Sequence, residues 1–353
     1  MGIETGISWT DSTWNAIRGC SRVSEGCRFC YAESTAYRFS GEGQPYDGLA
    51  VLKNGHASWT GKIEFVEKHL LDPLKWSPIL TGISNGEGEL KEKKNKDGSV
   101  TVTRERPRRI FVNSMSDLFH ENVTDLMRDK IFSVMQHAQS RGHIFQILTK
   151  RPQGMLDYLS NPSLYSRLTV TVDMVRNMYP KLPITPFSDP ARFPLKNIWM
   201  GVSIEDSRVK DRIDILRNVP AAVRFLSIEP LIGDVGELNL EGISWAIVGG
   251  ESGPHARPMM SHWAESVREQ CEAAGVAYYF KQNGEYVDAG HEEFGKLPAG
   301  EIKYLRSDGH EWPYDSVPTD EHADVNTMKR VGRKRSGDTL YGKVYHAFPG
   351  GAA

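Results

Sequence analysis

Three of the four cysteines lie within eleven residues near the N-terminus, and this cluster constrains the chain more than any other feature. Cys20, Cys27 and Cys30 have the spacing C-x6-C-x2-C. Gly19 and Gly26 each precede a cysteine, where glycine lets the backbone wrap closely around a bulky group. Four cysteines in 353 residues do not make a disulfide scaffold. Because thiolates are ligands of zinc and of iron–sulfur clusters, the cluster predicts a metal centre.

The number of ligands separates two kinds of metal centre. A structural zinc site uses four protein ligands, and the loop offers no fourth Cys or His. Cys271 falls in the middle of a predicted helix, where a small buried residue is the expected role. Three thiolates leave one position open, as an iron–sulfur cluster requires if it also binds a small molecule. Zinc, with His56, His69 or Cys271 as fourth ligand, stays an alternative.

Short runs rich in Val, Ile and Phe alternate with amphipathic stretches along most of the chain. Predicted strands cover 13–17, 109–113, 143–148, 197–202, 223–228, 244–248 and 276–280, and predicted helices begin near Tyr31 and cover 123–141, 152–159, 207–218 and 261–274. Strands that alternate with helices form parallel sheets buried on both faces. We therefore expect an α/β fold in which residues 1–286 form a parallel (β/α) barrel, partial or complete TIM-type. A doubly wound open sheet is the alternative, because strand order cannot be read from one sequence.

Two polar insertions interrupt this alternation, and a different segment follows it. Residues 83–108 contain the turn sequence Lys96-Asp97-Gly98 and predict an excursion hairpin. Residues 160–196 hold an extra helix and then a proline-rich stretch. From 287 to 353 the chain is polar and rich in Gly and Asp, which predicts a small C-terminal appendage.

Polar residues follow nearly every predicted strand, at the end where parallel barrels place their functional groups. Singly, each could be a helix cap or a partner of a helix dipole, but their shared position favours a lined polar site. The residues that we expect to line it are Asn113, Ser114, Ser116, Asp117, Lys150, Ser203, Glu205, Gly249, Gly250 and Glu251.

The cysteine triplet resembles the radical SAM signature, usually C-x3-C followed by C-x-aromatic-C. Cys27-Arg28-Phe29-Cys30 matches the second part, while the gap between the first two cysteines is six residues instead of three. Residues 7–285, which include Leu148-Thr149-Lys150-Arg151-Pro152 and Gly249-Gly250-Glu251-Ser252-Gly253, resemble a phage and prophage protein family known by its three-cysteine motif. That family has no settled function.

The radical SAM resemblance implies a [4Fe–4S] cluster on the three cysteines and S-adenosylmethionine as second cofactor. It places Asn113, Ser114, Ser116 and Asp117 near the methionine amine, and Ser203 and Glu205 near the ribose hydroxyls or the carboxylate. Lys150 would pair with a carboxylate, Gly249 and Gly250 would permit close backbone approach, and Glu251 would add charge at the rim. An electron donor such as flavodoxin or ferredoxin is an implied partner, and 5′-deoxyadenosyl radical chemistry the implied activity.

The sequence does not identify the substrate. DNA or a nucleotide is the candidate, because basic clusters at 104–109 and 329–335 could contact phosphates and because the resemblance is to phage proteins. Two other classes stay open. One is a zinc-stabilised barrel that binds nucleic acid without redox chemistry. The other is a metal-free barrel hydrolase that uses Asp117, Glu205, Glu229 and Glu251 as acid–base groups.

Composition excludes a polycation and gives no sign of a membrane protein. The formal net charge is −2, so any nucleic-acid binding must come from local patches. No apolar run approaches the roughly 20 residues that a membrane helix needs, and the N-terminus lacks a secretory pattern. We therefore expect a cytoplasmic protein.

Overall fold

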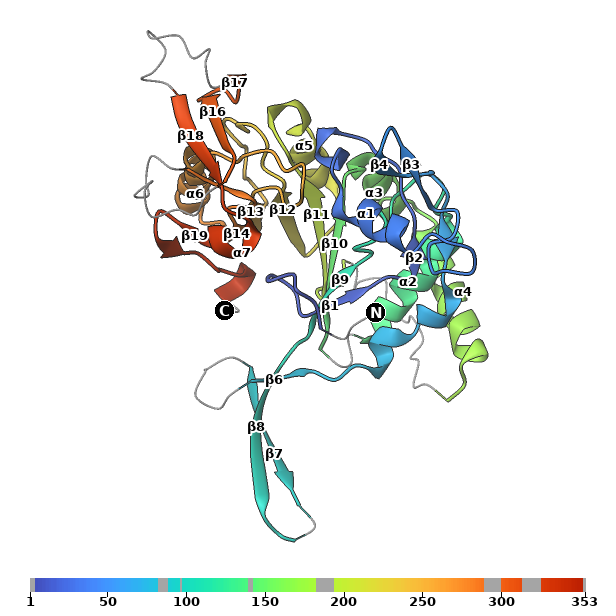
Figure 1. The fold of residues 1–353 in the computed structure, drawn as a ribbon. Helices are drawn as coiled ribbons and strands as arrows, with labels where there is room; N and C mark the ends of the chain where they lie inside the picture. The colour runs from blue at the N-terminus through green and yellow to red at the C-terminus, as the bar shows by residue number, and fades with distance from the viewer. Residues whose placement is uncertain are drawn as a thin grey trace.

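Among the residues that the structure describes, seven parallel strands form one sheet (Figure 1). The structure is a computed structural model and describes residues 4–81, 88–95, 97–138, 142–181, 194–288, 300–312 and 325–351. The strands are β1 (Ser12–Trp14), β9 (Arg109–Val112), β10 (Ile144–Thr149), β11 (Ile198–Ser203), β12 (Val223–Ile228), β13 (Trp245–Gly249) and β14 (Ala277–Gln282). They lie side by side in the order in which they occur in the chain.

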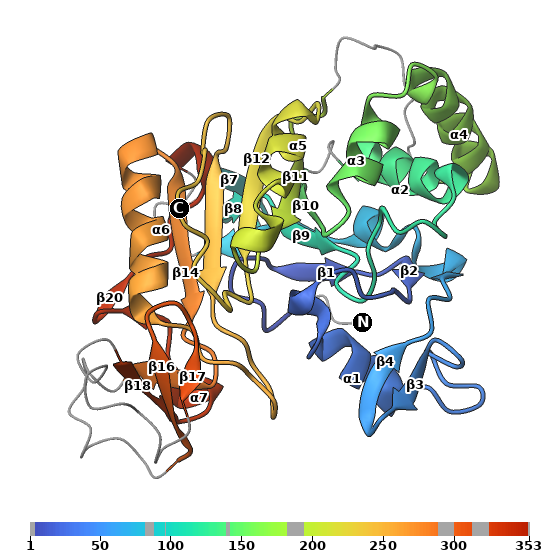
Figure 2. The ribbon, with the colours of Figure 1, turned by 90° about the horizontal axis from the view of Figure 1, so that it is seen from above.

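This sequential order decides between the two predicted architectures. A doubly wound sheet reverses its strand order part-way, which puts helices on both faces. Here every crossover runs in the same direction, so the helices lie on one side and the sheet curls into a half-barrel (Figure 2). The predicted α/β parallel barrel is thus confirmed as a curled, seven-stranded half-barrel, whereas closure into a full TIM barrel is not.

The helices that cover the outer side follow the strands as predicted. They are α2 (Asp125–Ala138), α3 (Pro152–Leu159), α4 (Leu164–Met178), α5 (Arg212–Asn218) and α6 (Ser261–Ala274). α5 packs on β11 and β12, and α6 packs on β13 and β14. α6 ends at Gly275, which caps it in the left-handed region with φ 67°. The predicted helix 207–218 begins as a separate 3₁₀ turn, Ser207–Val209.

The two faces of the sheet pack into two separate buried clusters. On each strand, alternate residues point outward into the main core, where Ile110 and Val248 are buried. The inner side holds a second cluster, formed by Trp9, Phe111, Trp199, Phe225, Trp245, Ile247 and Tyr279. At Gly201 a Cβ would lie 2.4 Å from the Phe225 ring, so this ring lies directly against the β11 backbone. Aromatic rings therefore fill the inner side.

The C-terminal residues return to the half-barrel. His346 bridges to Tyr279 of β14 in antiparallel fashion, and the two rings stack with centroids 4.5 Å apart. Phe348 packs on Trp245 at 5.1 Å, and the Arg109 guanidinium lies 3.6 Å from the centre of the Phe348 ring. Because Arg109 and Trp245 are the first residues of their strands, Phe348 covers the amino-terminal end of the sheet.

The two predicted insertions appear as separate elements. β6 (Ile79–Thr81), β7 (Glu89–Lys94) and β8 (Val100–Arg106) form an antiparallel sheet that projects from the body (Figure 1). The predicted turn at Asp97-Gly98 joins β7 to β8, although Lys96 lies outside the described residues. α4 is the predicted extra helix, and most of the proline-rich stretch, residues 182–193, lies outside the described residues.

The remaining elements lie in the N-terminal and C-terminal parts of the chain. The predicted first strand, 13–17, is divided, because β2 (Ile17–Arg18) leaves the sheet to pair with β5 (Glu64–Phe65). Near it lie α1 (Tyr31–Arg38), β3 (Ala50–Lys53), β4 (His56–Trp59), and the short 3₁₀ turns at 25–27, 67–69 and 72–75. The C-terminal part contains β15 (Tyr286–Asp288), β16 (Ile302–Arg306), β17 (Glu311–Trp312), β18 (Val325–Arg330), α7 (Arg333–Ser336), β19 (Thr339–Leu340), β20 (Lys343–Val344) and a 3₁₀ turn at 349–351. The division at 286/287 stays a prediction.

None of the described helices is both long and apolar enough to cross a membrane.

We predict that Phe348→Ala lowers the free energy of unfolding by about 2 kcal/mol, because it removes the ring between Trp245 and Arg109. Urea unfolding followed by tryptophan fluorescence measures the change. Val170→Ala in α4 is the control, since its side chain is 69% exposed and should change stability by less than about 0.5 kcal/mol. Equal stability of both variants would show that the tail does not hold the half-barrel together.

Candidate functional site

The cysteine loop joins β2 to α1 and lies at the carboxyl edge of the sheet. Gly19 has φ 91° and bridges to Ser116, beyond the end of β9. A Cβ on Gly19 would lie 2.1 Å from the Lys62 carbonyl oxygen, so only glycine fits between these backbones. Cys30 is the N-cap residue of α1. The loop is thus fixed at both ends by backbone structure, at the edge where parallel α/β folds carry their function.

The three thiols of this loop interact electrostatically. Cys20, Cys27 and Cys30 are all partly exposed. Negative charge on Cys27 or Cys30 raises the pKa of Cys20. Burial, with the Asp117 carboxylate, raises the pKa of the Cys20 thiol to about 12, and Arg151 opposes this rise. Burial also raises the pKa of Cys30, although backbone N–H groups at the start of α1 favour its thiolate. Within the described ranges, no three Cys, His, Asp or Glu side chains are grouped to hold a single metal ion.

Arg151 lies two residues beyond the end of β10 and is the centre of a hydrogen-bond network beside Cys20. Its guanidinium lies 3.9 Å from Cys20 Sγ and donates to the Ser21 carbonyl at 3.1 Å and hydroxyl at 2.7 Å. It also pairs with Asp117 at 3.3 Å and with Glu121 at 3.0 Å. A single cation therefore ties the cysteine loop to the sheet and places positive charge beside a thiol.

His120 also binds Ser21 of the cysteine loop. Its Nδ1 accepts from the Asn122 N–H at 3.1 Å, so Nε2 carries the proton and donates to Ser21 Oγ at 2.9 Å. The ring is fully buried. Burial and the charge of Arg151 lower the pKa of His120, which keeps the ring neutral.

Asp117 has a structural role in this network. Its carboxylate accepts from Thr149 Oγ1 at 2.7 Å, from the Lys150 N–H at 3.1 Å and from the Phe119 N–H at 2.9 Å, besides pairing with Arg151. Only 6% of the residue is exposed. These bonds use the carboxylate lone pairs to join the ends of β9 and β10, so direct contact of Asp117 with a methionine amine stays a prediction without support.

Glu205 holds the cysteine loop from the opposite side. Its buried carboxylate forms a close ion pair with Lys150 and a second pair with Arg212 at 3.2 Å, and it accepts from Ser24 Oγ at 2.9 Å. A Cβ on Gly26 would lie 2.2 Å from Glu205 Cγ. Burial by itself raises the pKa of Glu205, but Lys150 and Arg212 outweigh it and hold the pKa below its usual range. Lys150 and Glu205 thus pair with each other.

Glu251 forms a third attachment of the loop. Arg257 binds both of its carboxylate oxygens, at 2.7 and 2.8 Å, and donates to the Glu25 carbonyl oxygen at 3.1 Å. The Arg257 guanidinium also lies 5.3 Å from the centre of the Phe29 ring. Glu251 is 6% exposed, so it acts through Arg257 and not at the rim.

Four further predicted residues, Ser114, Ser116, Gly249 and Gly250, lie where two segments of the chain meet. Ser114 Oγ exchanges hydrogen bonds with the Asn15 side chain, and Ser116 Oγ donates to the Ile17 carbonyl oxygen at 3.0 Å. A Cβ on Gly250 would lie 2.1 Å from the Asn283 carbonyl oxygen, and one on Gly249 would only touch Lys281 and Gln282. Gly250 therefore permits the close approach of two protein segments.

Asn113 differs from these residues because its side chain has no structural role. Among the described residues neither amide atom has a hydrogen-bond partner, although the residue is only 3% exposed. Its N–H donates to the Trp14 carbonyl oxygen at 2.7 Å, which extends the β1–β9 ladder, and its φ of 61° ends the extended conformation there. Ser203 is also buried, and its hydroxyl makes no hydrogen bond within the described part of the chain. The Asn113 amide is therefore a buried polar group whose hydrogen-bonding capacity is not used by the described residues.

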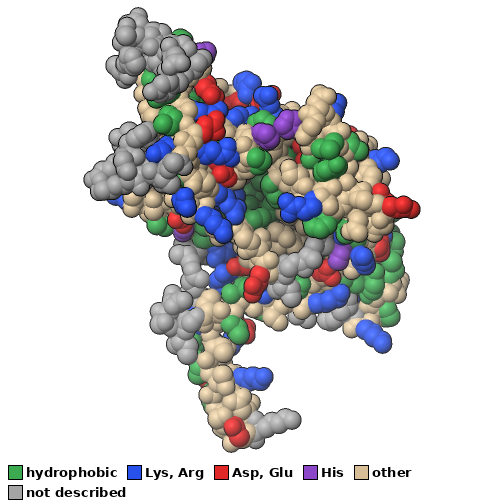
Figure 3. Space-filling model, viewed as in Figure 1, with side chains coloured by type: hydrophobic (Ala, Val, Ile, Leu, Met, Phe, Trp, Pro, Cys, Tyr) green, Lys and Arg blue, Asp and Glu red, His purple; other side chains and the backbone are tan. Residues whose placement is uncertain are grey.

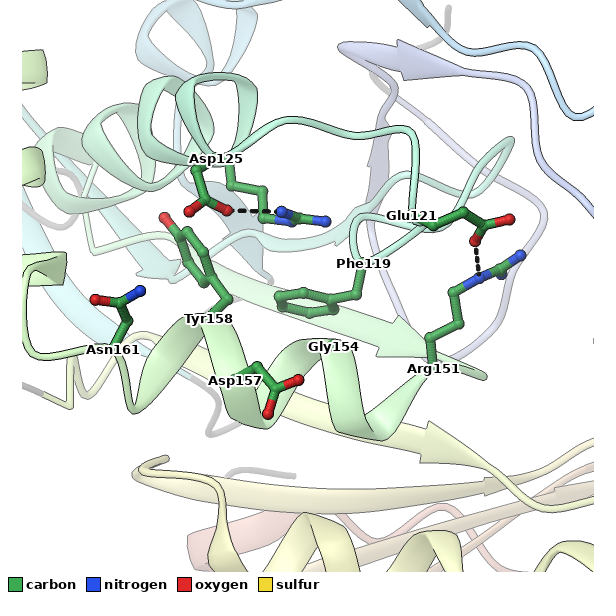
Figure 4. Close-up of a pocket in the computed structure, with 9 residues that line it drawn as sticks. Phe119, Glu121, Asp125, Arg151, Gly154, Asp157, Tyr158 and Asn161 are labelled. Atoms are coloured by element: carbon green, nitrogen blue, oxygen red, sulfur yellow. Dashed lines mark hydrogen bonds and ion pairs between the residues drawn. The ribbon is translucent and has the colours of Figure 1, made fainter.

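Two hollows adjoin the loop. One, of about 440 Å³, lies between α2 and α3, and Figure 4 shows Arg151 and Glu121 at one end of it with Tyr158 and Asn161 at the other. The second, of about 650 Å³, is lined by the cysteine loop and the β3–β4 hairpin. His120, Arg212 and Arg257 were not among the predicted site residues, and nothing local in the sequence marks them. Arg151 belongs to the strand-end sequence Thr149-Lys150-Arg151, two residues beyond β10, but was not named with the residues expected to line the site.

Comparison with known sequences places the chain in a family. The pattern of the family described as a protein of unknown function, DUF5131, matches residues 4–349. The chain belongs to DUF5131. No curated protein and no solved structure matches it. The match includes the cysteine loop and the C-terminal return at Phe348, so both are part of the DUF5131 unit.

In this DUF5131 chain, we predict that Gly26→Ala lowers the free energy of unfolding by about 2 kcal/mol, because the added methyl group overlaps Glu205. Urea denaturation measures the change. Gly41→Ala is the matched control, since its methyl group would meet Gln44 at an ordinary 3.6 Å. Wild-type stability of Gly26→Ala would show that the loop does not rest on Glu205.

Proposed function

We propose that this protein is a radical SAM enzyme in which Cys20, Cys27 and Cys30 hold a [4Fe–4S] cluster. The observation that carries the proposal is the position of the three thiols, on one loop at the carboxyl edge of a parallel half-barrel. Parallel α/β sheets place their reacting groups at this edge. The reaction belongs in the cytoplasm, where thiols stay reduced, and draws electrons from a donor such as flavodoxin or ferredoxin.

The donor set suits such a cluster. Arg151 supplies a cation 3.9 Å from Cys20 Sγ, and backbone N–H groups at the start of α1 oppose the burial that raises the pKa of Cys30. Hydrogen bonds and positive charge near the sulfurs are the means by which proteins stabilise and tune iron–sulfur clusters. Three cysteines also leave one iron without a protein ligand, as binding of S-adenosylmethionine requires.

A bound cluster would supply the one electron that breaks the C–S bond of S-adenosylmethionine, giving methionine and a 5′-deoxyadenosyl radical able to abstract hydrogen from a substrate. The chain's own residues position the partners. Arg151, Glu205 and Arg257 hold the loop on the sheet. Asn113 offers a donor group and an acceptor directly after β9, a pair that suits the amine and carboxylate of methionine or a base edge. The aromatic inner face excludes water from the far end of the half-barrel.

We expect protein purified without oxygen to be brown and to contain about four irons and four sulfides per chain. Cys20→Ala, Cys27→Ala and Cys30→Ala should each lose the iron, while the matched variant Cys271→Ser should keep it, because Cys271 is buried in α6 away from the loop. Iron and sulfide assays, with 5′-deoxyadenosine release after reduction, measure both claims. One zinc in place of iron, or iron loss only in Cys271→Ser, would refute the proposal.

We also expect Asn113→Gly to weaken S-adenosylmethionine binding at least about tenfold without lowering stability. Glycine accepts the φ of 61° found at this residue, and the amide that it removes makes no hydrogen bond in the described structure. Calorimetric titration and urea unfolding give the two readouts separately. If binding were unchanged, Asn113 would have no place in the cofactor site; Ser114→Ala, which removes a hydroxyl bonded to Asn15, is the comparison variant.

A further inference from the structure

A pocket of about 650 Å³ lies beside the thiols and carries only positive formal charge. It is lined on one side by the cysteine loop, with Arg22, Arg28 and Phe29, and on the other by the β3–β4 hairpin, with Lys53, His56 and Trp59. No Asp or Glu is among the described residues that line it. In a chain whose formal net charge is −2, this concentration of cations marks a local site for an anion.

The cations of this pocket differ in how far the protein already neutralises them. Arg22 forms a two-point ion pair with the buried Glu33, which orients its guanidinium. Arg28 is 61% exposed, and its nearest carboxylate, Glu25, lies 3.8 Å away. Lys53 is exposed and has no ion-pair partner among the described residues. Arg28 and Lys53 are therefore available to a ligand that approaches from solvent.

The rings of Phe29, His56 and His255 line the pocket together with these cations. The Phe29 ring lies 5.4 Å from His255, and His255 lies 4.8 Å from His56. Arg28 lies 5.3 Å from the centre of the Phe29 ring. A surface that combines rings with cations suits a strand that carries both bases and phosphates. Unstacked bases can use such rings, whereas a base-paired duplex keeps its bases stacked on one another.

Basic residues continue from the pocket along the neighbouring loop. Arg330 donates to the carbonyl oxygens of Gly253 and Pro254, next to His255, and pairs with Glu285 and Glu301. The exposed basic residues of α7 follow Arg330 in the chain. Figure 3 shows Lys, Arg and His side chains around a hollow on the face seen in Figure 1. In the other predicted basic cluster, Arg106 pairs with Asp11 at 2.7 Å and Arg109 stacks on Phe348.

We propose that this pocket binds single-stranded nucleic acid, with phosphates on Arg28 and Lys53 and a base beside Phe29. The inference deepens the proposed function, on which it rests for the chemistry but not for the binding. Phe29 lies between Cys27 and Cys30 in the sequence, so a strand bound here runs directly past the thiols. The substrate class is then a base or sugar of a nucleic-acid strand.

An acidic protein, such as an electron donor, is the competing occupant of a basic surface. The pocket favours the strand, because its volume is within the range of about 300–1,000 Å³ found for sites that enclose a ligand. An acidic protein would contact the exposed cations of the rim but would leave the rings inside the hollow unfilled.

The test is fluorescence anisotropy with a labelled oligothymidylate of about 12 nucleotides, titrated with the full chain in the absence of S-adenosylmethionine. Arg28→Glu/Lys53→Glu should weaken binding at least about tenfold and flatten the dependence of log K on log salt by about 1 to 2. Lys93→Glu/Lys94→Glu, on exposed positions of the projecting hairpin, is the control with the same charge change and should bind like the wild type. Lys53→Glu alone, outside the cysteine loop, should show part of the loss.

Three results would overturn the inference: no binding of the oligonucleotide, equal loss in the hairpin control, or pocket variants that slow reduction by flavodoxin while oligonucleotide binding is unchanged. Because binding is measured without cofactor, its outcome is independent of the iron and 5′-deoxyadenosine assays. If protein purified without oxygen contained no iron but still bound the oligonucleotide through Arg28 and Lys53, the radical mechanism would be refuted and the nucleic-acid site would stand.

Discussion

The buried carboxylate of Glu205 is the contact on which the arrangement of the site depends. Burying a charge costs several kcal/mol unless it is paired and hydrogen-bonded, and Glu205 is paired with both Lys150 and Arg212. Its remaining capacity is used by Ser24 of the cysteine loop. One carboxylate therefore joins the end of β10, helix α5 and the loop, and a shift of the thiols relative to the sheet would break its hydrogen bond with Ser24.

Two arginines repeat this principle at other points of the loop. Arg151 joins Ser21 to the carboxyl ends of β9 and β10, and Arg257 joins the Glu25 carbonyl to Glu251. Guanidinium groups suit this role because their fixed fork of donors can bind a carboxylate and a backbone carbonyl at once. Polar residues at the strand ends thus divide into two groups. Most hold the loop, whereas the Asn113 amide makes no hydrogen bond with the described residues.

The sequence predicted local structure well, because local rules determine it. The hydrophobic pattern and Gly275 located α6 to the residue, and the strand-end rule placed the cysteine loop at the carboxyl edge of the sheet. It did not give strand order, the return of Phe348 to Trp245, or the pairing of Lys150 with Glu205, 55 residues apart. These depend on which distant segments meet, so a strand-end residue that supports the loop has the same local pattern as one that meets a ligand.

The loop also connects the two sites that the proposals distinguish. Arg22, Arg28 and Phe29 line the basic pocket, and the thiols lie in the same short segment. A group bound to the thiols and a strand bound in the pocket would therefore be positioned by one rigid element, not by two domains that must close on each other. Radical chemistry requires such fixed geometry, because a reactive species must meet its target before it meets solvent. The loop attachments at Ser21, Ser24 and Glu25 supply that rigidity on three sides.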